Sequence, residues 1–370
     1  MENYKSLNEL RPGAILAEDI YANTALPIVR KGTMLEIDHL EVLDLFGIKR
    51  AKIEERIVNR LQGEQKEAGK ADDISSDIDQ LLEKRINRTS DLHTLYKKAV
   101  NDYKREFTSW KSGAKLDIAK VRLLIMPLLE TSMENKKMLI ILNEYSNRKE
   151  YLYHHAVSVG LLTAALASEL GYPKGTTLQL GLAGTIADCG MSKISTTLME
   201  KAAFLTKDEF NEVKKHPVLS FQMMHDSPLL RQEMKLAVLQ HHERLDGSGY
   251  PRGDRDEKVS QLSQILAVAD VFHAMTCERV YRAKESPYRV AEMLKEEEFG
   301  KFDSAILEAL HALIGMPSVG DKVLLTDGTL GEVIAINSNL PLRPAIHVVN
   351  SKKSVDLSKH RSIAIEKLLD

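Results

Sequence analysis

The sequence contains few of the residues on which several classes of protein depend. Its 370 residues include two cysteines, Cys189 and Cys277, which are too few for a disulfide framework and stand in no CxxC arrangement. We therefore expect a reducing compartment and two buried thiols. No stretch approaches the roughly 18 to 20 apolar residues of a membrane span, and the first residues contain no hydrophobic signal-peptide region. These absences predict a cytoplasmic protein without a membrane span.

An excess of charge of one sign is also missing. The chain has 51 Lys and Arg against 53 Asp and Glu, which gives a net charge of -2. This balance supplies no global electrostatic reason to bind nucleic acid or an anionic membrane, so any phosphate site must be local. The apolar content of 43% is ample for a large core, and the length predicts two or three domains.

The pattern of apolar residues changes along the chain and divides it into five parts. Residues 1–55 carry short strand and helix patterns and predict a small α+β module, whereas residues 56–90 are polar and charged like a linker. Residues 91–145 have helical patterns, residues 146–316 are helical almost throughout, and residues 317–370 contain three strand patterns of a small β module. The predicted fold class is mainly α, a helical bundle flanked by the two small modules.

The helical patterns of the bundle have clear boundaries. One covers residues 151–170 and stops at a glycine, and another covers residues 260–276. The sequence Thr206-Lys207-Asp208-Glu209 is typical of a capping box that opens a helix.

A regular apolar stripe follows the predicted linker. Its members recur at intervals of three and four from Leu92 to Trp110, as on one face of a helix. Such a stripe usually belongs to the core of its own chain. It can also pair with a second subunit, which leaves a homodimer through residues 91–145 open.

The densest group of chemically active residues is the stretch from His241 to Pro251, His-His-Glu-Arg-Leu-Asp-Gly-Ser-Gly-Tyr-Pro. Neutral imidazole is the commonest protein ligand for divalent transition metals, and adjacent rings can face one cavity only where the backbone leaves a helix. The glycines allow the chain to turn sharply around a bound group. The simpler alternative is a helix end and a turn with two surface histidines.

Further potential metal ligands stand near the ends of the surrounding helical patterns. The full set is His155, Asp188, His216, His241, His242 and Asp270. Nitrogen and carboxylate oxygen from five segments can converge on a pair of metal ions, a standard device for hydrolysing phosphate esters. Spacing alone does not establish convergence, because a single histidine on a helix is more often a core or surface residue.

The order of these motifs resembles the HD-GYP family of metal-dependent phosphodiesterases, a branch of the HD superfamily whose usual substrate is cyclic di-GMP. The resemblance covers roughly residues 150–310. It rests on His155-Ala156-Val157-Ser158-Val159, Ala187-Asp188-Cys189-Gly190, His216-Pro217, the stretch from His241 to Pro251, and Val268-Ala269-Asp270.

The resemblance implies roles for single residues. It assigns the six potential ligands to one or two divalent metal ions, with Fe or Mn expected and Asp188 as the bridging carboxylate. Arg279 and Arg282 match basic positions expected to hold a substrate phosphate, which suits a guanidinium fork, although two arginines at this spacing are also typical of a solvated helix face. Tyr250 is expected to line the nucleotide pocket. The implied ligand is cyclic di-GMP or a related nucleotide.

The chain departs from the family at the motif that gives the superfamily its name. The His-Asp pair is Ala187-Asp188 here, so a methyl group replaces an imidazole ligand. The lysine usual three residues after the aspartate is Met191, which makes Lys193 the candidate catalytic cation if the loop lets it reach back.

Two further departures concern the surroundings of His155. Tyr151 stands where some members carry a Glu ligand, so a third metal ion is not expected. His273 stands where Asp is common, either as a substitute ligand or as a residue that adjusts the surroundings of a ligand.

These losses leave several functions open. We expect an HD-GYP protein of bacterial cyclic di-GMP signalling with weak or absent hydrolysis, because losing a ligand should cost at least the roughly 10- to 100-fold that losing a ligand's supporting partner costs. A slow enzyme, a nucleotide sensor without turnover and a scaffold for a partner all fit this expectation. The alternatives are an active cyclic di-GMP phosphodiesterase and a phosphohydrolase of another nucleotide, since fold alone does not set the substrate.

Overall fold

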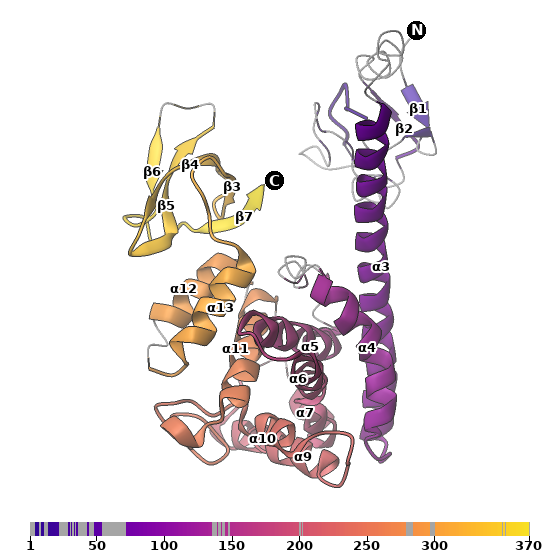
Figure 1. Ribbon diagram of the computed structural model, residues 1–370, viewed down its shortest axis with the longest axis vertical. Helices are drawn as coiled ribbons and strands as arrows, with labels where there is room; N and C mark the ends of the chain where they lie inside the picture. The colour runs from indigo at the N-terminus through magenta and orange to yellow at the C-terminus, as the bar shows by residue number, and fades with distance from the viewer. Residues whose placement is uncertain are drawn as a thin grey trace. The chain divides into compact units, whose positions relative to one another are not determined.

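Figure 1 shows the computed structural model, which describes the chain from Tyr4 to Leu369 with interruptions. Outside the described residues lie 7–8, 11–13, 22–28, 30, 32, 34, 36–42, 44–47, 54–71, 135–138, 140–141, 143–144, 147–148, 200, 202, 279–283, 297–299, 350 and 352. For residues 72–91 the backbone alone is described. The chain forms two compact units, residues 1–86 and 87–370, and each is considered by itself.

The first unit contains a small antiparallel sheet with its own core. β1 (Tyr4–Ser6) pairs with β2 (Arg50–Lys52), and an isolated bridge joins Leu16 to Ile53. The buried apolar residues of this unit are Leu10, Leu16, Ile20, Val29, Leu35, Leu43, Ala51 and Ile53. Most of the helix and of the second strand predicted for residues 1–55 lies outside the described residues.

A long helix, α3 (Asp72–Lys111), begins in the first unit and ends in the second. It starts inside the stretch 56–90, whose composition predicts a linker. Lys, Glu, Arg and Gln have helix propensities close to that of Leu, so a charged composition indicates solvation and is compatible with a helix. The domain boundaries drawn from the sequence stay predictions.

The apolar stripe of α3 is buried within its own chain. Tyr96 and Trp110 are fully buried, and the ring of Phe107 lies 5.6 Å from that of Tyr153 on α5 (Tyr151–Glu169). The stripe also shares one continuous core with α4 (Ile118–Glu134). A dimer therefore needs surfaces other than this stripe, and the homodimer through residues 91–145 stays a prediction.

The second unit contains the predicted bundle of helices. α5 packs against α6 (Lys174–Ile186) and α11 (Gln261–Thr276), and α11 packs against α10 (Gln232–Gln240). The remaining helices are α7 (Thr196–Met199), α8 (Lys207–Val213), α9 (His216–Met224), α12 (Pro287–Glu296), α13 (Ser304–Ile314) and the short 3₁₀ helices η3 (Cys189–Lys193) and η4 (Asp256–Lys258). The mainly helical fold class is confirmed.

Several helix boundaries match their sequence signals. The capping box is confirmed at the start of α8, where the Thr206 hydroxyl accepts from the Glu209 N–H and the Glu209 carboxylate accepts from the Thr206 N–H. α5 and α11 match the helices predicted over residues 151–170 and 260–276 closely. Across the part of the chain that the structure describes, no helix combines the length and the apolar character needed to cross a membrane.

The C-terminal module is an antiparallel sheet whose described strands run in the order β6-β5-β4-β3-β7. The strands are β3 (Lys322–Leu325), β4 (Leu330–Asn337), β5 (Leu340–Val348), β6 (Ser354–Asp356) and β7 (Ile365–Leu369). The three strand patterns in the sequence correspond to β3, β4 and β5. No sequence pattern predicts β6 or β7, because β6 has three residues with one apolar side chain and the apolar residues of β7 do not alternate.

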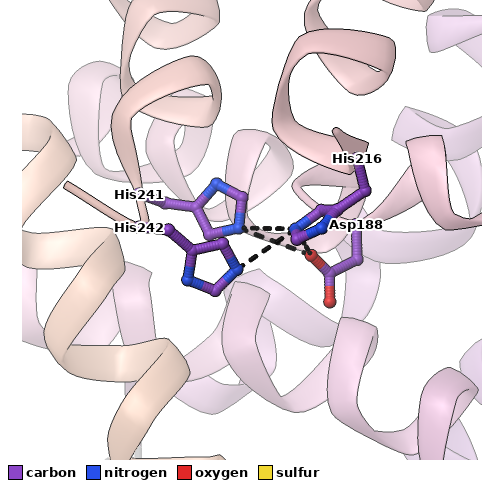
Figure 2. A group of neighbouring side chains, drawn as sticks. All are labelled: Asp188, His216, His241 and His242. Carbon is purple, nitrogen blue, oxygen red and sulfur yellow. Dashed lines mark hydrogen bonds and ion pairs between the residues drawn. The ribbon is translucent and has the colours of Figure 1, made fainter. Parts of the chain in front are cut away.

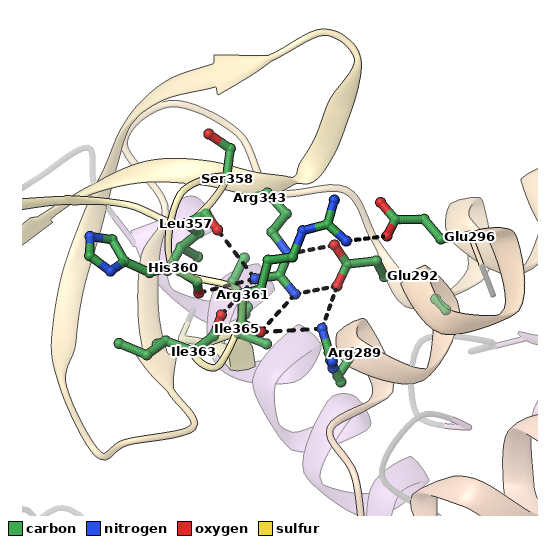
Figure 3. Close-up of polar contacts among 12 residues, drawn as sticks. Arg289, Glu292, Glu296, Arg343, Leu357, Ser358, His360, Arg361, Ile363 and Ile365 are labelled. Atoms are coloured by element: carbon green, nitrogen blue, oxygen red, sulfur yellow. Dashed lines mark hydrogen bonds and ion pairs between the residues drawn. The ribbon is translucent and has the colours of Figure 1, made fainter.

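A buried ion pair ties this sheet to α12. Arg343 on β5 is 2% exposed, and its guanidinium makes two contacts with the Glu292 carboxylate. The same guanidinium donates to the carbonyls of Leu357, His360 and Ile363 (Figure 3). Because the Arg343 guanidinium is removed from water, these partners must stabilise its positive charge.

We expect Glu292→Gln to destabilise the protein by about 3 to 5 kcal/mol, because it leaves a buried guanidinium without its counter-charge. Unfolding in urea followed by circular dichroism measures this change.

The matched control is Glu296→Gln on the same helix. Its partner Arg361 has a side chain that is 70% exposed, so the loss should stay below about 1 kcal/mol. Equal unfolding midpoints for the two variants would contradict a special role for the buried pair.

Candidate metal centre

The six predicted ligands meet in one place in the second unit. They are His155 on α5, Asp188 directly before η3, His216 at the start of α9, His241 and His242 directly after α10, and Asp270 on α11. Asp188 forms one group with His216, His241 and His242 and another with His155 and Asp270. Within each group, one nitrogen or oxygen atom from every residue lies within 4.8 Å of the others. The structure thus supplies the convergence that spacing left open, while the role of these residues as ligands stays a prediction.

The first group places three imidazoles around one carboxylate (Figure 2). Asp188 Oδ1 lies 3.2 Å from His216 Nε2 and 3.4 Å from His241 Nε2. His242 Nε2 lies 3.1 Å from His216 Nε2. The three ring nitrogens and the carboxylate oxygen therefore border one small common volume.

Backbone carbonyls orient two of these rings through the Nδ1 atoms, which face away from the centre. His216 Nδ1 lies 2.8 Å from the Val213 carbonyl oxygen, and His241 Nδ1 lies 2.6 Å from the Val238 carbonyl oxygen. Both carbonyls belong to the last turns of helices, where no N–H of the same helix takes them. A carbonyl only accepts, so Nδ1 carries the hydrogen, and in the neutral form of each ring Nε2 presents a lone pair to the centre. This is the tautomer that a metal ligand requires.

The Asp188 carboxylate fits a bound cation. Its Oδ1 atom is buried and, among the described residues, meets the geometry of no hydrogen bond. Burial alone would raise the pKa of Asp188, but attraction to His216 and its other imidazole neighbours holds that pKa well below the usual range. Burial and the nearby His241 lower the pKa of His242, which favours the neutral, ligating form. Imidazole and carboxylate together suit a divalent transition metal.

The second group has fewer donors. His155 Nε2 lies 2.9 Å from Asp270 Oδ1 and 3.6 Å from Asp188 Oδ2. Burial would raise the pKa of Asp270, but the adjacent imidazoles of His155 and His242 lower it. Ala187 is buried directly before Asp188 and supplies no donor atom. This group therefore contains one imidazole where the first contains three.

A glycine sets the distance between two of the segments. A Cβ atom at Gly190 would lie 2.3 Å from the His216 carbonyl oxygen and 2.6 Å from the Ser220 backbone nitrogen. The Gly190 N–H also donates to the Ser220 hydroxyl at 2.8 Å. The segment that carries Asp188 therefore rests directly on the helix that carries His216.

We expect Gly190→Ala to lower the stability by about 1 to 3 kcal/mol, because the added methyl group forces η3 away from α9. The metal content of the purified protein should fall with it, since Asp188 and His216 move apart. Thermal unfolding and mass spectrometry of bound metal measure the two effects.

The control is Gly175→Ala on α6, where a Cβ atom meets nothing within 4 Å. Alanine is the better helix former, so this change should leave the metal content unchanged and raise the stability by up to about 1 kcal/mol. A Gly190→Ala protein with normal stability and normal metal content would refute the close-approach argument.

Glu243 has a role that sequence reasoning missed. Its carboxylate is 2% exposed and accepts the backbone N–H groups of Arg252, Gly253 and Asp254 at 2.6, 3.2 and 3.1 Å. It thus closes the loop that follows the two histidines. No spacing rule signals this role, because the partners are backbone groups.

Tyr250 joins the centre to a cavity. Its ring stacks on His242 with centroids 4.6 Å apart, and the Lys214 ammonium lies 5.3 Å from the same ring. Beside it opens a cavity of about 490 Å³. The cavity is lined by Asn211, Lys214, Lys215, Val218, Leu219, Gln222, Tyr250 and Pro251.

Lys193 is not part of this arrangement, and two other predicted site residues are not described. Lys193 ends η3, and its ammonium donates to the Trp110 carbonyl at 2.6 Å. Within the described part of the chain no ion pair joins Lys193 to Asp188, so its catalytic role stays a prediction. Arg279 and Arg282 lie outside the described residues.

Comparison with known proteins identifies the domain. Residues 140–306 match the HD domain family. A cyclic di-GMP phosphodiesterase of Pseudomonas aeruginosa is 33% identical over 255 residues, which cover 67% of this chain and 60% of that protein. A cyclic di-GMP phosphodiesterase of Borreliella burgdorferi is 29% identical over 215 residues, 57% of this chain and 56% of that protein. The chain belongs to the HD-GYP family.

The fold of a solved structure agrees with this HD-GYP assignment. An HDG"Y"P protein from Bdellovibrio bacteriovorus has a TM-score of 0.51 at 17% identity, covering 84% of this chain and 98% of that chain. The HD domain, residues 140–306, contains all six potential ligands. HD-domain phosphodiesterases are metal-dependent, and the imidazole and carboxylate set fits that requirement.

Proposed function

We propose that this HD-GYP protein binds a cyclic dinucleotide, cyclic di-GMP in the first instance, at a metal centre that hydrolyses it weakly or not at all. One observation carries the proposal: a complete group of three imidazoles and Asp188 adjoins a group that lacks an imidazole at Ala187. The chain spans 60% and 56% of the two cyclic di-GMP phosphodiesterases it resembles, so their substrate is a proposal for this chain.

The six potential ligands would form two metal sites. His216, His241 and His242 would hold one divalent ion together with Asp188. His155 and Asp270 would hold a second, with Asp188 shared because it belongs to both groups. When bound, such a pair of ions supplies Lewis acidity and an activated water to a phosphate ester. Iron or manganese is the proposed metal.

The weakness of the second site follows from its donor count. Loss of a residue that merely supports a ligand costs roughly 10- to 100-fold in metal affinity or activity, and the loss of a ligand should cost at least that. The site with three imidazoles should therefore fill first. A single filled site can still bind a phosphate group, which is the basis for proposing nucleotide binding with little turnover.

The cavity beside Tyr250 supports a nucleotide as the ligand. Lys214 supplies local positive charge in a chain whose net charge is -2, whereas the charge of Lys215 is balanced by Glu212. The Lys214 ammonium lies above Tyr250, whose ring in turn touches His242 of the centre. A phosphate placed in the cavity would therefore lie close to the metal ligands.

We expect Ala187→His to raise the metal content towards two ions per chain and cyclic di-GMP turnover by about 10- to 100-fold, because it restores an imidazole to the weaker site. Metal analysis and chromatography of linear and mononucleotide products, on protein prepared anaerobically with iron or manganese, measure both. Adding Asp188→Asn to Ala187→His should abolish the gain.

Unchanged metal content and turnover in Ala187→His would show that the missing imidazole is not what limits the site. Fast turnover by the unaltered protein would contradict weak hydrolysis. Other cyclic and linear nucleotides belong in the same assay, since turnover of one of them and not of cyclic di-GMP would support the alternative substrate.

We expect Lys214→Gln to weaken cyclic di-GMP binding about 10-fold, which corresponds to about 1.4 kcal/mol, because a charge-assisted contact to phosphate is lost. Calorimetric titration of the metal-loaded protein measures it.

Lys215→Gln is the matched control. This neighbouring lysine is exposed and already pairs with Glu212, so its removal should change the affinity by less than about 3-fold. Equal effects of the two substitutions would argue against a specific contact at Lys214.

A further inference from the structure

His155 is held differently from the other imidazoles of the centre. Among the described residues, its Nδ1 atom contacts two side chains and no carbonyl: His273 Nδ1 lies at 3.0 Å and the Tyr151 hydroxyl at 3.1 Å. The cause is its position inside α5, where the surrounding carbonyls are engaged in the helix. The tautomer of His155 therefore depends on side chains.

His273 stands one turn after Asp270 on α11, so both side chains point to the same face of that helix. Its ring is 1% exposed, and its centroid lies 5.1 Å from that of His155. The sulfur of Cys277, which is also buried, lies 3.4 Å from His273 Nε2 and 3.7 Å from His273 Nδ1. A buried chain of polar atoms thus runs from Asp270 through His155 and His273 to Cys277.

The hydrogens of this series of contacts can be arranged in two directions. Each neutral imidazole carries one N–H, and the two Nδ1 atoms at 3.0 Å share a single hydrogen. In one direction the Cys277 thiol donates to His273 Nε2, His273 Nδ1 donates to His155 Nδ1, and His155 Nε2 donates to Asp270. In the other, His155 Nδ1 donates to His273 Nδ1, and His273 Nε2 donates to the sulfur. No proton is gained or lost between them.

The second direction is the one that a metal site needs. It leaves a lone pair on His155 Nε2, the atom that faces Asp270 and Asp188. The Tyr151 hydroxyl can donate or accept, so it does not select a tautomer by itself. His273 selects it when its Nε2 carries the hydrogen, because its Nδ1 can then only accept.

We propose that His273 is a positioning residue of the second metal site, which accepts the hydrogen of His155 Nδ1 and so keeps His155 Nε2 available as a ligand. The inference rests on the proposed function, because it presupposes a metal ion at His155, Asp188 and Asp270. His273 is not itself a ligand: among the described residues, neither group of converging donors includes it. Because Ala187 supplies no ligand atom, the metal affinity of this site should depend more on His273 than that of a site with a full set of ligands.

Two substitutions distinguish the effect of a hydrogen-bond acceptor at position 273 from the effect of side-chain volume. In His273→Asn the side-chain oxygen can take the place of Nδ1 as an acceptor, whereas His273→Leu fills the volume without any polar atom. We expect His273→Leu to weaken manganese binding at the weaker site by about 10- to 100-fold and His273→Asn to remain within about 3-fold of the unaltered protein. Calorimetric titration of the metal-free full chain with manganese measures both affinities.

Nitrogen-15 NMR of labelled histidine rings in the metal-free protein gives a second readout. The His155 signals are identified by their loss in His155→Gln. We expect the Nδ1–H tautomer of His155 in His273→Asn, and the Nε2–H tautomer, donated to Asp270, in His273→Leu. The two readouts together distinguish tautomer control from a general loss of packing.

The control is His311→Leu on α13, which removes a buried histidine whose Nε2 lies 3.3 Å from the Ala291 carbonyl and which belongs to neither group of donors. Manganese affinity should not change. Normal affinity in His273→Leu, or an equal loss in His273→Leu and His273→Asn, would overturn the inference. No nucleotide enters these measurements, so a failure to bind or cleave cyclic di-GMP would overturn the proposed function and leave this result standing.

Discussion

The carboxylate of Asp188 carries a negative charge inside the bundle, and the surrounding site is built to stabilise that charge. His216 and His241 approach one of its oxygens, and His155 approaches the other. Removing a carboxylate from water is costly unless donors or cations replace the lost hydration. One oxygen, Oδ1, has no hydrogen bond among the described residues and can still accept a cation. A divalent cation bound there would add to the stabilisation from the imidazoles, which links the stability of the fold to metal binding.

The helix before the HD-type bundle supports the centre from two sides. The Trp110 carbonyl of α3 accepts from Lys193 in the short helix that follows Asp188. About four turns earlier along α3, the Tyr96 hydroxyl contacts the side chains of His154 and Ser158 at 3.0 and 2.9 Å. His154 directly precedes His155 in the chain. The apolar stripe that the sequence predicts is therefore both core and the support on which two ligand-bearing segments rest.

The sequence predicts the parts of this protein that depend on local patterns. The periodicity of α5 and α11 and the capping box at Thr206 follow from residue type and spacing. Residue type also makes the six converging residues candidate ligands, but their assignment to one centre rests on the resemblance to the HD-GYP family. Glu243 binds backbone groups about ten positions later, and Arg343 on a strand binds a carboxylate on helix α12. The residues next to Glu243 or Arg343 in the sequence do not reveal these partners, because the contacts form only in the folded structure. Lys193 shows the same limit, since its ammonium reaches a carbonyl that any residue at position 110 would offer.

The two halves of the centre differ in what holds their imidazoles. In the first half, the carbonyls at Val213 and Val238 fix the tautomers of His216 and His241, and a carbonyl persists whatever side chain stands at its position. In the second half, the tautomer of His155 depends on the side chain of His273, and the neighbouring ligand position is already occupied by Ala187. A metal site supported by the backbone tolerates substitution around it, whereas a site supported by side chains weakens with each one. The half built on helix ends is therefore the half expected to retain its metal ion when the other loses affinity.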